Sequence, residues 1–145
     1  MPITPEDIYT KILDKMKSIF RSEFGGSVPT YVDKDNKSVG SQYIRLEPRG
    51  SELVEELSSG QIRQYNIDIY FYFRDKNIKI SALEHVLRYT SRIEALVHNN
   101  RTATLSDSSD IFNCKIEATE LNALEEDNEY VVLLEWNGQH MGNIS

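Results

Sequence analysis

Residues 61–74 read QIRQYNIDIYFYFR, and this stretch decides the fold. From Tyr65 onward its odd positions are apolar or aromatic, whereas its even positions are largely polar. The two faces are Tyr65, Ile67, Ile69, Phe71 and Phe73 on one side, and Gln64, Asn66, Asp68 and Arg74 on the other. Alternation with a period of two residues, rich in β-branched and aromatic side chains, predicts a strand with one face on a core. At ~3.3 Å per residue this strand would span roughly 45 Å, about twice a typical strand, so we expect it to be central and to protrude.

The composition favours one soluble globular domain. The chain has 145 residues, of which 39% are hydrophobic and 27% are charged, and we expect a single domain over residues 1–145. No apolar run approaches the ~20 residues that cross a membrane, and no signal-peptide pattern opens the chain, so we expect the protein inside a cell. Cys114 is the only cysteine. An internal disulfide and a cysteine-based zinc site are therefore excluded.

The net charge of −7 is concentrated near the C-terminus. No Lys or Arg follows Lys115, yet seven acidic residues do, whereas the 115 residues before this point carry 16 basic and 23 − 7 = 16 acidic groups. These acids are Glu117, Glu120, Glu125, Glu126, Asp127, Glu129 and Glu135. An acidic C-terminal region repels phosphate, which argues against a conventional nucleic-acid-binding surface. A solvated acidic hairpin tip explains the same pattern, and the two interpretations are compatible.

Two helices are predicted from apolar residues at three- and four-residue spacing. The first runs from about Pro5 to Glu23 and ends at Gly25-Gly26. Its apolar stripe is Ile8, Ile12, Met16, Ile19 and Phe20. The second helix follows a Ser81 to Glu84 capping box and ends at Asn99-Asn100. Its expected stripe is Ile80, Leu83, Leu87, Thr90, Ile93 and Val97.

A hairpin with a long tip precedes the central strand. Residues 42–47 alternate as a strand that we expect Pro48-Arg49-Gly50 to end. Residues 50–60 would then form a tip far longer than the usual 2–5 residues. A one-turn helix capped by Ser51 is the alternative for this segment. The tip carries apolar and acidic side chains together, which favours contact with something: Leu53, Val54 and Leu57, with Glu52, Glu55 and Glu56.

The remaining segments complete the fold class. Residues 28–32 are predicted as a short extended piece, and residues 112–118 and 130–136 as strands, with an acidic turn between the last two. Residues 101–110 are expected as a loop and residues 139–145 as a loose tail. The order of elements predicts an α+β fold, with two helices packed on a mainly antiparallel β-sheet and a long protruding hairpin.

No catalytic, metal-binding or phosphate-binding constellation is present in the sequence. The histidines lie far apart, and the Gly25-Gly26-Ser27 segment lacks the ending of a phosphate-binding loop and is better explained as a helix stop. Asp68 could be a perturbed carboxylate, but the polar character of its face favours a solvated or interface carboxylate. The aromatic run of residues 70–73 could stack bases, yet it lacks interleaved basic residues except Arg74, so core plus subunit contact is the better interpretation.

The order of elements resembles that of the tail-terminator and tail-completion proteins of tailed bacteriophages. The likeness rests on an N-terminal helix, a hairpin leading into SGQIRQYNIDIYFYFR, a second helix and a closing hairpin that ends in YVVLLEW. The resemblance implies an α+β subunit that forms a ring of six, caps the tail tube and joins it to the neck. It implies a structural role with no enzyme active site, cofactor or metal. The implied location is the virion tail or neck, after assembly in the host cytoplasm.

A ring would explain the long strand and the mixed tip. We expect subunit or partner contacts at Leu53, Val54, Leu57, Tyr70 and Tyr72. We expect acids that face the channel at Glu52, Glu55 and Glu56, or in the turn at Glu125, Glu126 and Asp127. The implied partners are further copies of the chain, the tail tube, a sheath if present and neck or connector proteins, while DNA passes without specific binding. Another head–tail connector, a small α+β ligand-binding or regulatory domain and, third, an enzyme are the alternatives.

Overall fold

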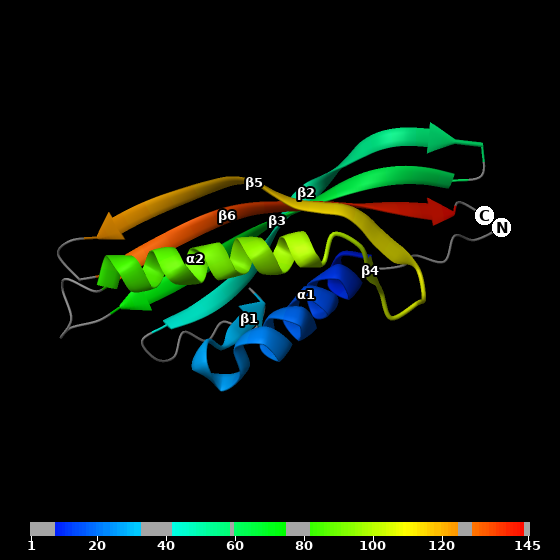
Figure 1. The fold of residues 1–145 in the computed structure, drawn as a ribbon. Helices are drawn as coiled ribbons and strands as arrows, with labels where there is room; N and C mark the ends of the chain where they lie inside the picture. Colours follow the sequence, from blue (N-terminus) through cyan, green and yellow to red (C-terminus); the bar gives the residue numbers. More distant parts are fainter. Residues whose placement is uncertain (1–7, 33–41, 59, 75–81, 125–128, 144–145) are drawn as a thin grey trace.

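The computed structural model describes residues 8–32, 42–58, 60–74, 82–124 and 129–143, and all structural statements concern these residues. Figure 1 shows their elements in space. In chain order they are helix α1 (Ile8–Phe24), a 3-10 turn η1 (Gly25–Ser27), β1 (Thr30–Val32), β2 (Gln42–Leu57), β3 (Gly60–Arg74), helix α2 (Ala82–Asn99), β4 (Ala103–Thr104), β5 (Asp110–Leu124) and β6 (Glu129–Asn143). The predicted helix start at Pro5, the Ser81 cap and the turn acids Glu125, Glu126 and Asp127 lie outside the described residues.

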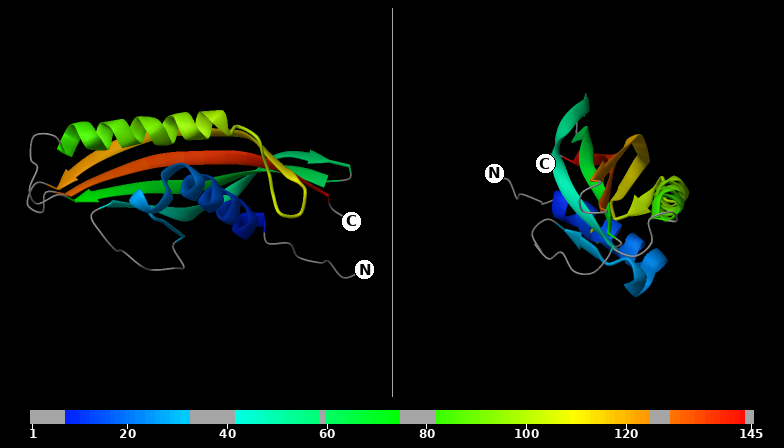
Figure 2. Two further views of the ribbon diagram at one scale, coloured as in Figure 1. Left: turned by 60° about the horizontal axis from the view of Figure 1, so that its bottom comes forward. Right: turned by 90° about the vertical axis from the view of Figure 1, so that its left-hand side faces the viewer.

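The strands form one six-stranded sheet in the order β1-β2-β3-β6-β5-β4. β1 runs parallel to β2, and all other neighbours are antiparallel. Most of the described residues lie in strands, and the sheet curls into a half-barrel around the core (Figure 2). The predicted α+β class, with two helices packed on a mainly antiparallel sheet, is therefore wrong: the architecture is mostly β. Two irregularities each in β2 and β5 increase the local twist and so help the sheet to curl.

The prediction for the central strand is confirmed. β3 pairs along its whole length with β2 on one side and β6 on the other. Its odd face carries Ile67, Ile69, Phe71 and Phe73 into the core. These side chains share one hydrophobic cluster with residues from both helices.

Asp68, on the opposite face of β3, was expected to be a solvated or interface carboxylate, and the solvated alternative is wrong. Its side chain is buried, with a residue exposure of 5%. Arg49 covers it, since Nε lies 3.3 Å from the Asp68 Oδ2, and the Tyr70 hydroxyl donates to the same oxygen at 3.4 Å. The prediction missed this because Arg49 is the extra residue of a β-bulge between Pro48 and Gly50 and belongs to no simple alternation.

The two helices differ in how well their buried faces were predicted. α1 buries Ile12, Met16 and Phe20 as expected, and it ends at Gly25, whose φ of 58° is the left-handed conformation that glycine adopts readily. α2 buries Thr90, Ile93 and Val97 of its predicted stripe, together with Val86, which was not predicted, while Ile80 lies outside the described residues. The predicted stripe residues Leu83 and Leu87 are 42% and 49% exposed. Thr90 tolerates burial because its hydroxyl donates to the Val86 carbonyl at 2.8 Å.

β2 and β6 continue past their predicted ends and, together with the first half of β3, build an extension that we call the arm. It comprises residues 50–57 of β2, 60–66 of β3 and 137–143 of β6. In Figures 1 and 2 the arm reaches beyond α2 at one end of the molecule. The expected long tip is wrong, because β2 ends at Leu57 and β3 already begins at Gly60. The expected loose tail is also wrong as far as Asn143, because Gln139 to Asn143 pair with β3.

Pro48 and Gly50 allow β2 to continue where the sequence predicted a stop. Proline is compatible with a strand at a bulge, and Gly50, with a φ of 123°, adopts a backbone conformation open mainly to glycine. The predicted loop over residues 101–110 contains the short strand β4, which pairs with Asp110 and Ile111 of β5.

Candidate assembly surface

The arm presents apolar side chains and an unpaired strand edge. Leu53 is 50% exposed and Val54 is 48% exposed, while Leu57 is half-buried. β1 pairs with β2 only as far as Leu46, so beyond it the outer edge of β2 has no strand partner among the described residues. Exposed sheet edges of this length are usually covered by another chain or protected by charge. The arm is therefore a region of the described structure suited to assembly.

The register of the arm divides the three predicted channel acids between its two faces. Opposed residues of paired strands project from the same face of a sheet. Glu52 lies opposite Gln64 and Glu55 lies opposite Ile62, on the face that is outer in the body of the molecule. A second irregularity, between Leu53 and Glu55, shifts the register. Glu56 consequently projects from the same face as Leu53. Glu56 lies opposite Gln61 and Leu53 lies opposite Arg63, and both partners belong to the core-side face of β3. All three carboxylates are exposed.

Tyr9 of α1 fixes the base of the arm. Its hydroxyl accepts a hydrogen bond from the Gly50 N–H at 2.7 Å and contacts the Gly50 carbonyl and, at 2.8 Å, the Asn66 carbonyl. Its ring packs edge-on against Tyr65, with a centroid distance of 5.0 Å. The bulge that starts the arm is thus tied to a helix of the body. No sequence pattern could indicate this contact, which joins residues 41 positions apart.

The two predicted contact tyrosines belong to an aromatic row on the outer face of the sheet. Tyr72 stacks on Tyr43 with ring centroids 4.6 Å apart, and Tyr70 lies 6.1 Å from Tyr72. Tyr31 of β1 extends the row at 6.2 Å from Tyr43. Tyr70 and Tyr72 are half-buried in this row. The row therefore stabilises the sheet and leaves only part of each predicted contact residue accessible.

The raised pKa values of five tyrosines predict a loss of stability at alkaline pH. Burial is the main cause that raises the pKa of Tyr9, Tyr43, Tyr65, Tyr70 and Tyr72 above 10.0. Because the unfolded chain ionises first, the free energy of unfolding is unaffected by these groups below about pH 10 and falls as the pH rises beyond it. Urea unfolding at about pH 8 and pH 11 measures the fall, and Tyr72→Phe should make it shallower. A free energy that stays constant across this range would contradict the prediction.

The residues with potential chemistry are occupied by structural contacts. His85 Nε2 lies 2.9 Å from the Gln42 Oε1, and His140 Nε2 lies 2.9 Å from the Ser109 Oγ. Burial raises the pKa of the Cys114 thiol to about 12, which leaves it protonated and unreactive. In the part of the chain that the structure describes, no group of three or more His, Cys, Asp or Glu side chains could hold a metal ion.

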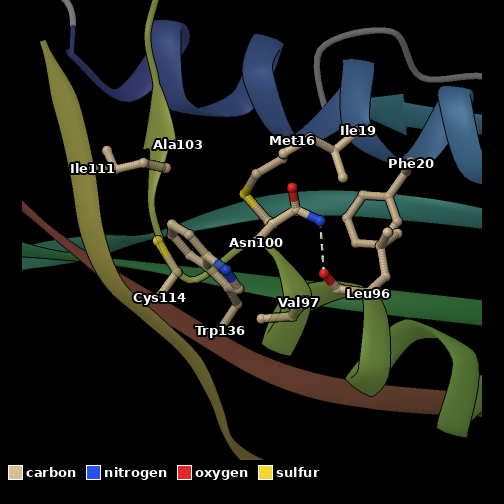
Figure 3. Close-up of a pocket in the computed structure, with 10 residues that line it drawn as sticks. All are labelled: Met16, Ile19, Phe20, Leu96, Val97, Asn100, Ala103, Ile111, Cys114 and Trp136. Atoms are coloured by element: carbon tan, nitrogen blue, oxygen red, sulfur yellow. Dashed lines mark hydrogen bonds between the residues drawn. The ribbon is translucent and has the colours of Figure 1, made fainter.

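An apolar cavity lies between α1, α2 and the sheet (Figure 3). Its volume is about 20 Å³, and Phe20, Val97, Ile111 and Trp136 are among its lining residues. Asn100, at its edge, donates to the Leu96 carbonyl at 2.8 Å. Ligand sites usually enclose ~300–1,000 Å³, so this cavity offers no room for the small molecule of the ligand-binding alternative.

A second hollow, which we call the groove, lies where the end of α2 faces β5. Its volume is about 360 Å³ and it is open to solvent. Its lining combines apolar with polar and charged residues: Val97, Cys114 and Ile116, with Glu94, His98, Arg101 and Lys115. No sequence pattern indicates the groove, because its residues come from a helix end, a loop and a bulged strand. The pairing register of β5 shifts between Phe112 and Lys115, where Asn113 has a φ of 54°. Residues in this part of the strand therefore do not alternate regularly between the two faces.

The comparisons with known proteins bear on the fold. No family model matches the chain, and no curated protein matches it. Among solved structures, it is similar to a chain of the "Virion of native gene transfer agent (GTA) particle", with a TM-score of 0.52 and 12% sequence identity over 93% of this chain and 92% of that chain. The curled sheet with two helices is thus a fold that occurs in a virion. Neither described helix is long and apolar enough to cross a membrane.

Proposed function

We propose that the chain is a structural, non-enzymatic virion protein of a phage-like particle. In this proposal six copies form a ring that caps the tail tube and joins it to the neck or connector. The observation that carries the proposal is the arm, a three-stranded extension with an unpaired edge and half-exposed Leu53 and Val54. Such a surface is unfavourable in an isolated monomer and is covered in an assembly. The likeness of the whole fold to a chain of a virion supports the same conclusion.

Removing the apolar side chains of the arm should weaken assembly without unfolding the subunit. The variant is Leu53→Ser with Leu57→Ser. Both positions lie at the far end of the arm and outside the hydrophobic core, so the subunit should keep its thermal midpoint. Each buried leucine at a contact typically contributes about 1.5–3 kcal/mol, so the variant should shift rings toward monomers. Size-exclusion chromatography with light scattering and negative-stain microscopy measure this shift.

The matched control is Leu83→Ser with Leu87→Ser, which removes two comparably exposed leucines from α2. It should leave assembly unchanged. Rings that form equally well with both double variants would show that the arm is not a subunit contact. A wild-type protein that never forms rings, alone or with tail and neck proteins, would exclude the ring itself.

We further propose that acids of the arm line the passage for DNA. Glu52 and Glu55 share one face of the arm, which makes them the better pair for this role than the whole triplet. At physiological salt, charges act over ~8 Å, so passing DNA would sense only acids near the channel wall. Replacing both by Lys should cause salt-sensitive DNA retention and impaired delivery, while rings still form. Infection or transfer assays on variant particles measure delivery, and normal delivery would mean that these acids do not face the channel.

A further inference from the structure

We infer that the outer edge of β5 adds an extended segment of a partner protein as a further strand of the sheet. In this inference the segment turns aliphatic side chains towards α2 and basic side chains towards the opposite face. The site lies at the end of the molecule opposite to the arm (Figure 1). The inference therefore does not depend on the proposed ring.

The edge of β5 is unpaired over its second half. β4 pairs only with Asp110 and Ile111, and the Cys114 N–H donates to the Arg101 carbonyl at 3.0 Å. Farther along, residues 118–124 pair regularly with β6 on one side and have no strand partner on the other side among the described residues. In an antiparallel pair, the N–H and C=O groups of every second residue point away from the neighbouring strand. These groups can hold an added strand by main-chain hydrogen bonds.

Three exposed leucines accompany this edge, and we call them the leucine patch: Leu83 and Leu87 of α2 and Leu121 of β5. They are 42%, 49% and 43% exposed. The Thr119 hydroxyl of β5 donates to the Glu94 carboxylate of α2 at 3.3 Å, so Glu94 marks the side of the helix that faces β5. Leu83 and Leu87 precede Glu94 by eleven and seven residues, which places them on the same stripe of the helix. Leu121 projects from the same face of β5 as Thr119.

The leucines of the two elements border the same part of the edge, because α2 and β5 run in opposite directions. The end of α2 lines the groove together with residues 114–116 of β5, whereas Glu94, earlier in the helix, meets Thr119. Figures 1 and 2 show the same antiparallel arrangement. Leu87 lies ~10 Å before Glu94 along the helix, and Leu121 lies ~7 Å beyond Thr119 along the strand. An added strand would therefore have the leucine patch on one of its faces.

The charge around the edge indicates which residues the partner carries between its aliphatic ones. Acids outnumber bases among the described residues that border the edge: Glu84, Glu94, Glu117 and Glu120, with Arg88 and Lys115. Both bases already contact an acid, at 3.1 Å for Arg88 with Glu84 and at 3.9 Å for Lys115 with Glu117. Glu120 is exposed and projects from the face opposite to Leu121. A Lys or Arg on that face of the added strand would lie beside Glu120.

A second copy of the chain does not match these requirements. The unpaired edge of β2 carries Glu52, Glu55 and Glu56 and would bring acids to the acids of β5. Two copies of the β5 edge would likewise place Glu117 and Glu120 of both chains in one interface. Like charges in opposed positions destabilise paired strands. The partner is therefore a different protein, with aliphatic and basic residues in alternation.

A synthetic peptide tests the inference on the full chain. The probe has alternating Lys and Val over about nine residues, enough to cover the free edge. Its isomer carries the same residues in blocks and has the same charge. The alternating peptide should bind at least about tenfold more tightly, because only this peptide presents valines on one face and lysines on the other. Fluorescence anisotropy of the labelled peptides gives both dissociation constants. Hydrogen exchange at single-amide resolution should slow on binding at the amides of residues 118–124 that point away from β6.

Substitutions in the leucine patch and at the acid should weaken the binding of the alternating peptide. We expect an increase of about tenfold in the dissociation constant for Leu83→Ser with Leu87→Ser, and a similar increase at low salt for Glu120→Lys. The matched controls are Leu53→Ser with Leu57→Ser and Glu52→Lys, which alter the arm and should leave peptide binding unchanged. Circular dichroism verifies that every variant is folded.

Equal binding of the two peptides, or unchanged binding by the Leu83 and Leu87 double variant, would overturn the inference, because the acidic surface would then attract cations without adding a strand. Slow exchange of the outward amides of residues 118–124 in the isolated chain would also overturn it, because the edge would then be covered already by the chain itself or by a second copy. Neither result bears on the ring, which the arm variants test. Absence of rings in the wild type, with binding of the alternating peptide intact, would refute the proposed function and leave this inference standing.

Discussion

Ile69→Ala should lower the free energy of unfolding by about 2–5 kcal/mol, the usual cost of deleting a large buried aliphatic side chain. Ile69 is fully buried, and it lies between Leu46 of β2 and Leu134 of β6, which are fully buried as well. β3 is held on both sides by neighbouring strands, so the surroundings cannot collapse easily into the space that the side chain leaves. The thermal midpoint should fall by roughly 5–15 °C for a chain of this size.

The control for this prediction is Val54→Ala in the arm. It removes a comparable amount of apolar side chain from a position that is 48% exposed. The midpoint of the monomer should then move by no more than about 2 °C, as surface substitutions usually do. Equal midpoints for the Ile69 variant and the wild type would mean that the core lies on the other face of β3.

Gly138→Ala should destabilise the fold, whereas Gly142→Ala, four residues further along β6, should not. A Cβ atom at Gly138 would lie 2.7 Å from the Trp136 Cη2, which is too close for a real contact, and 3.0 Å from the Cys114 Sγ, which is tighter than most contacts of this kind. The indole packs over Gly138 and cannot move freely, since Trp136 is only 4% exposed. Overpacking of this kind typically costs about 1–3 kcal/mol.

At Gly142 the nearest atoms to a new Cβ belong to the His140 ring, at an ordinary 3.9 Å. Alanine there loses less backbone entropy on folding and should leave stability unchanged or raise it by up to about 1 kcal/mol. Chemical unfolding of the two variants should therefore give effects of opposite sign or of clearly different size. Two equal effects would indicate that glycine is required in β6 for a reason other than the space taken by Trp136.

The sequence was informative where one face of an element is buried. The odd face of β3 and the buried stripe of α1 were predicted correctly. A buried face requires apolar residues at a fixed spacing, because a polar residue at one of these positions lowers the stability of the fold. The stop of α1 at Gly25 was also predictable, since a left-handed residue at a helix end favours glycine. In α2 the prediction was correct for Thr90, Ile93 and Val97, which are buried. It was wrong for Leu83 and Leu87, which are apolar yet exposed.

The arm shows where sequence patterns fail. Leu53 and Val54 interrupt the alternation of β2 at a bulge, and both faces of this segment are exposed, so no period of two can develop. Pro48 and Gly50, which usually end a strand, are here accommodated by another bulge. The composition of the segment nevertheless identified it as a candidate contact, since exposed leucines beside acids are uncommon on an isolated loop. The groove had no such signal, because its lining residues meet only in three dimensions.

The continuity of β3 has a mechanical consequence. The same strand forms the middle of the arm and the centre of the core, and it is paired with β2 from Gly60 to Phe73 and with β6 from Gly60 to Arg74. A pulling force applied at the arm along its axis acts parallel to β3, so it shears the backbone hydrogen bonds on both sides together instead of opening them one by one. Tension that enters a subunit through its arm is thereby distributed over the whole sheet, and the hairpin can be pulled hard without peeling away from the body.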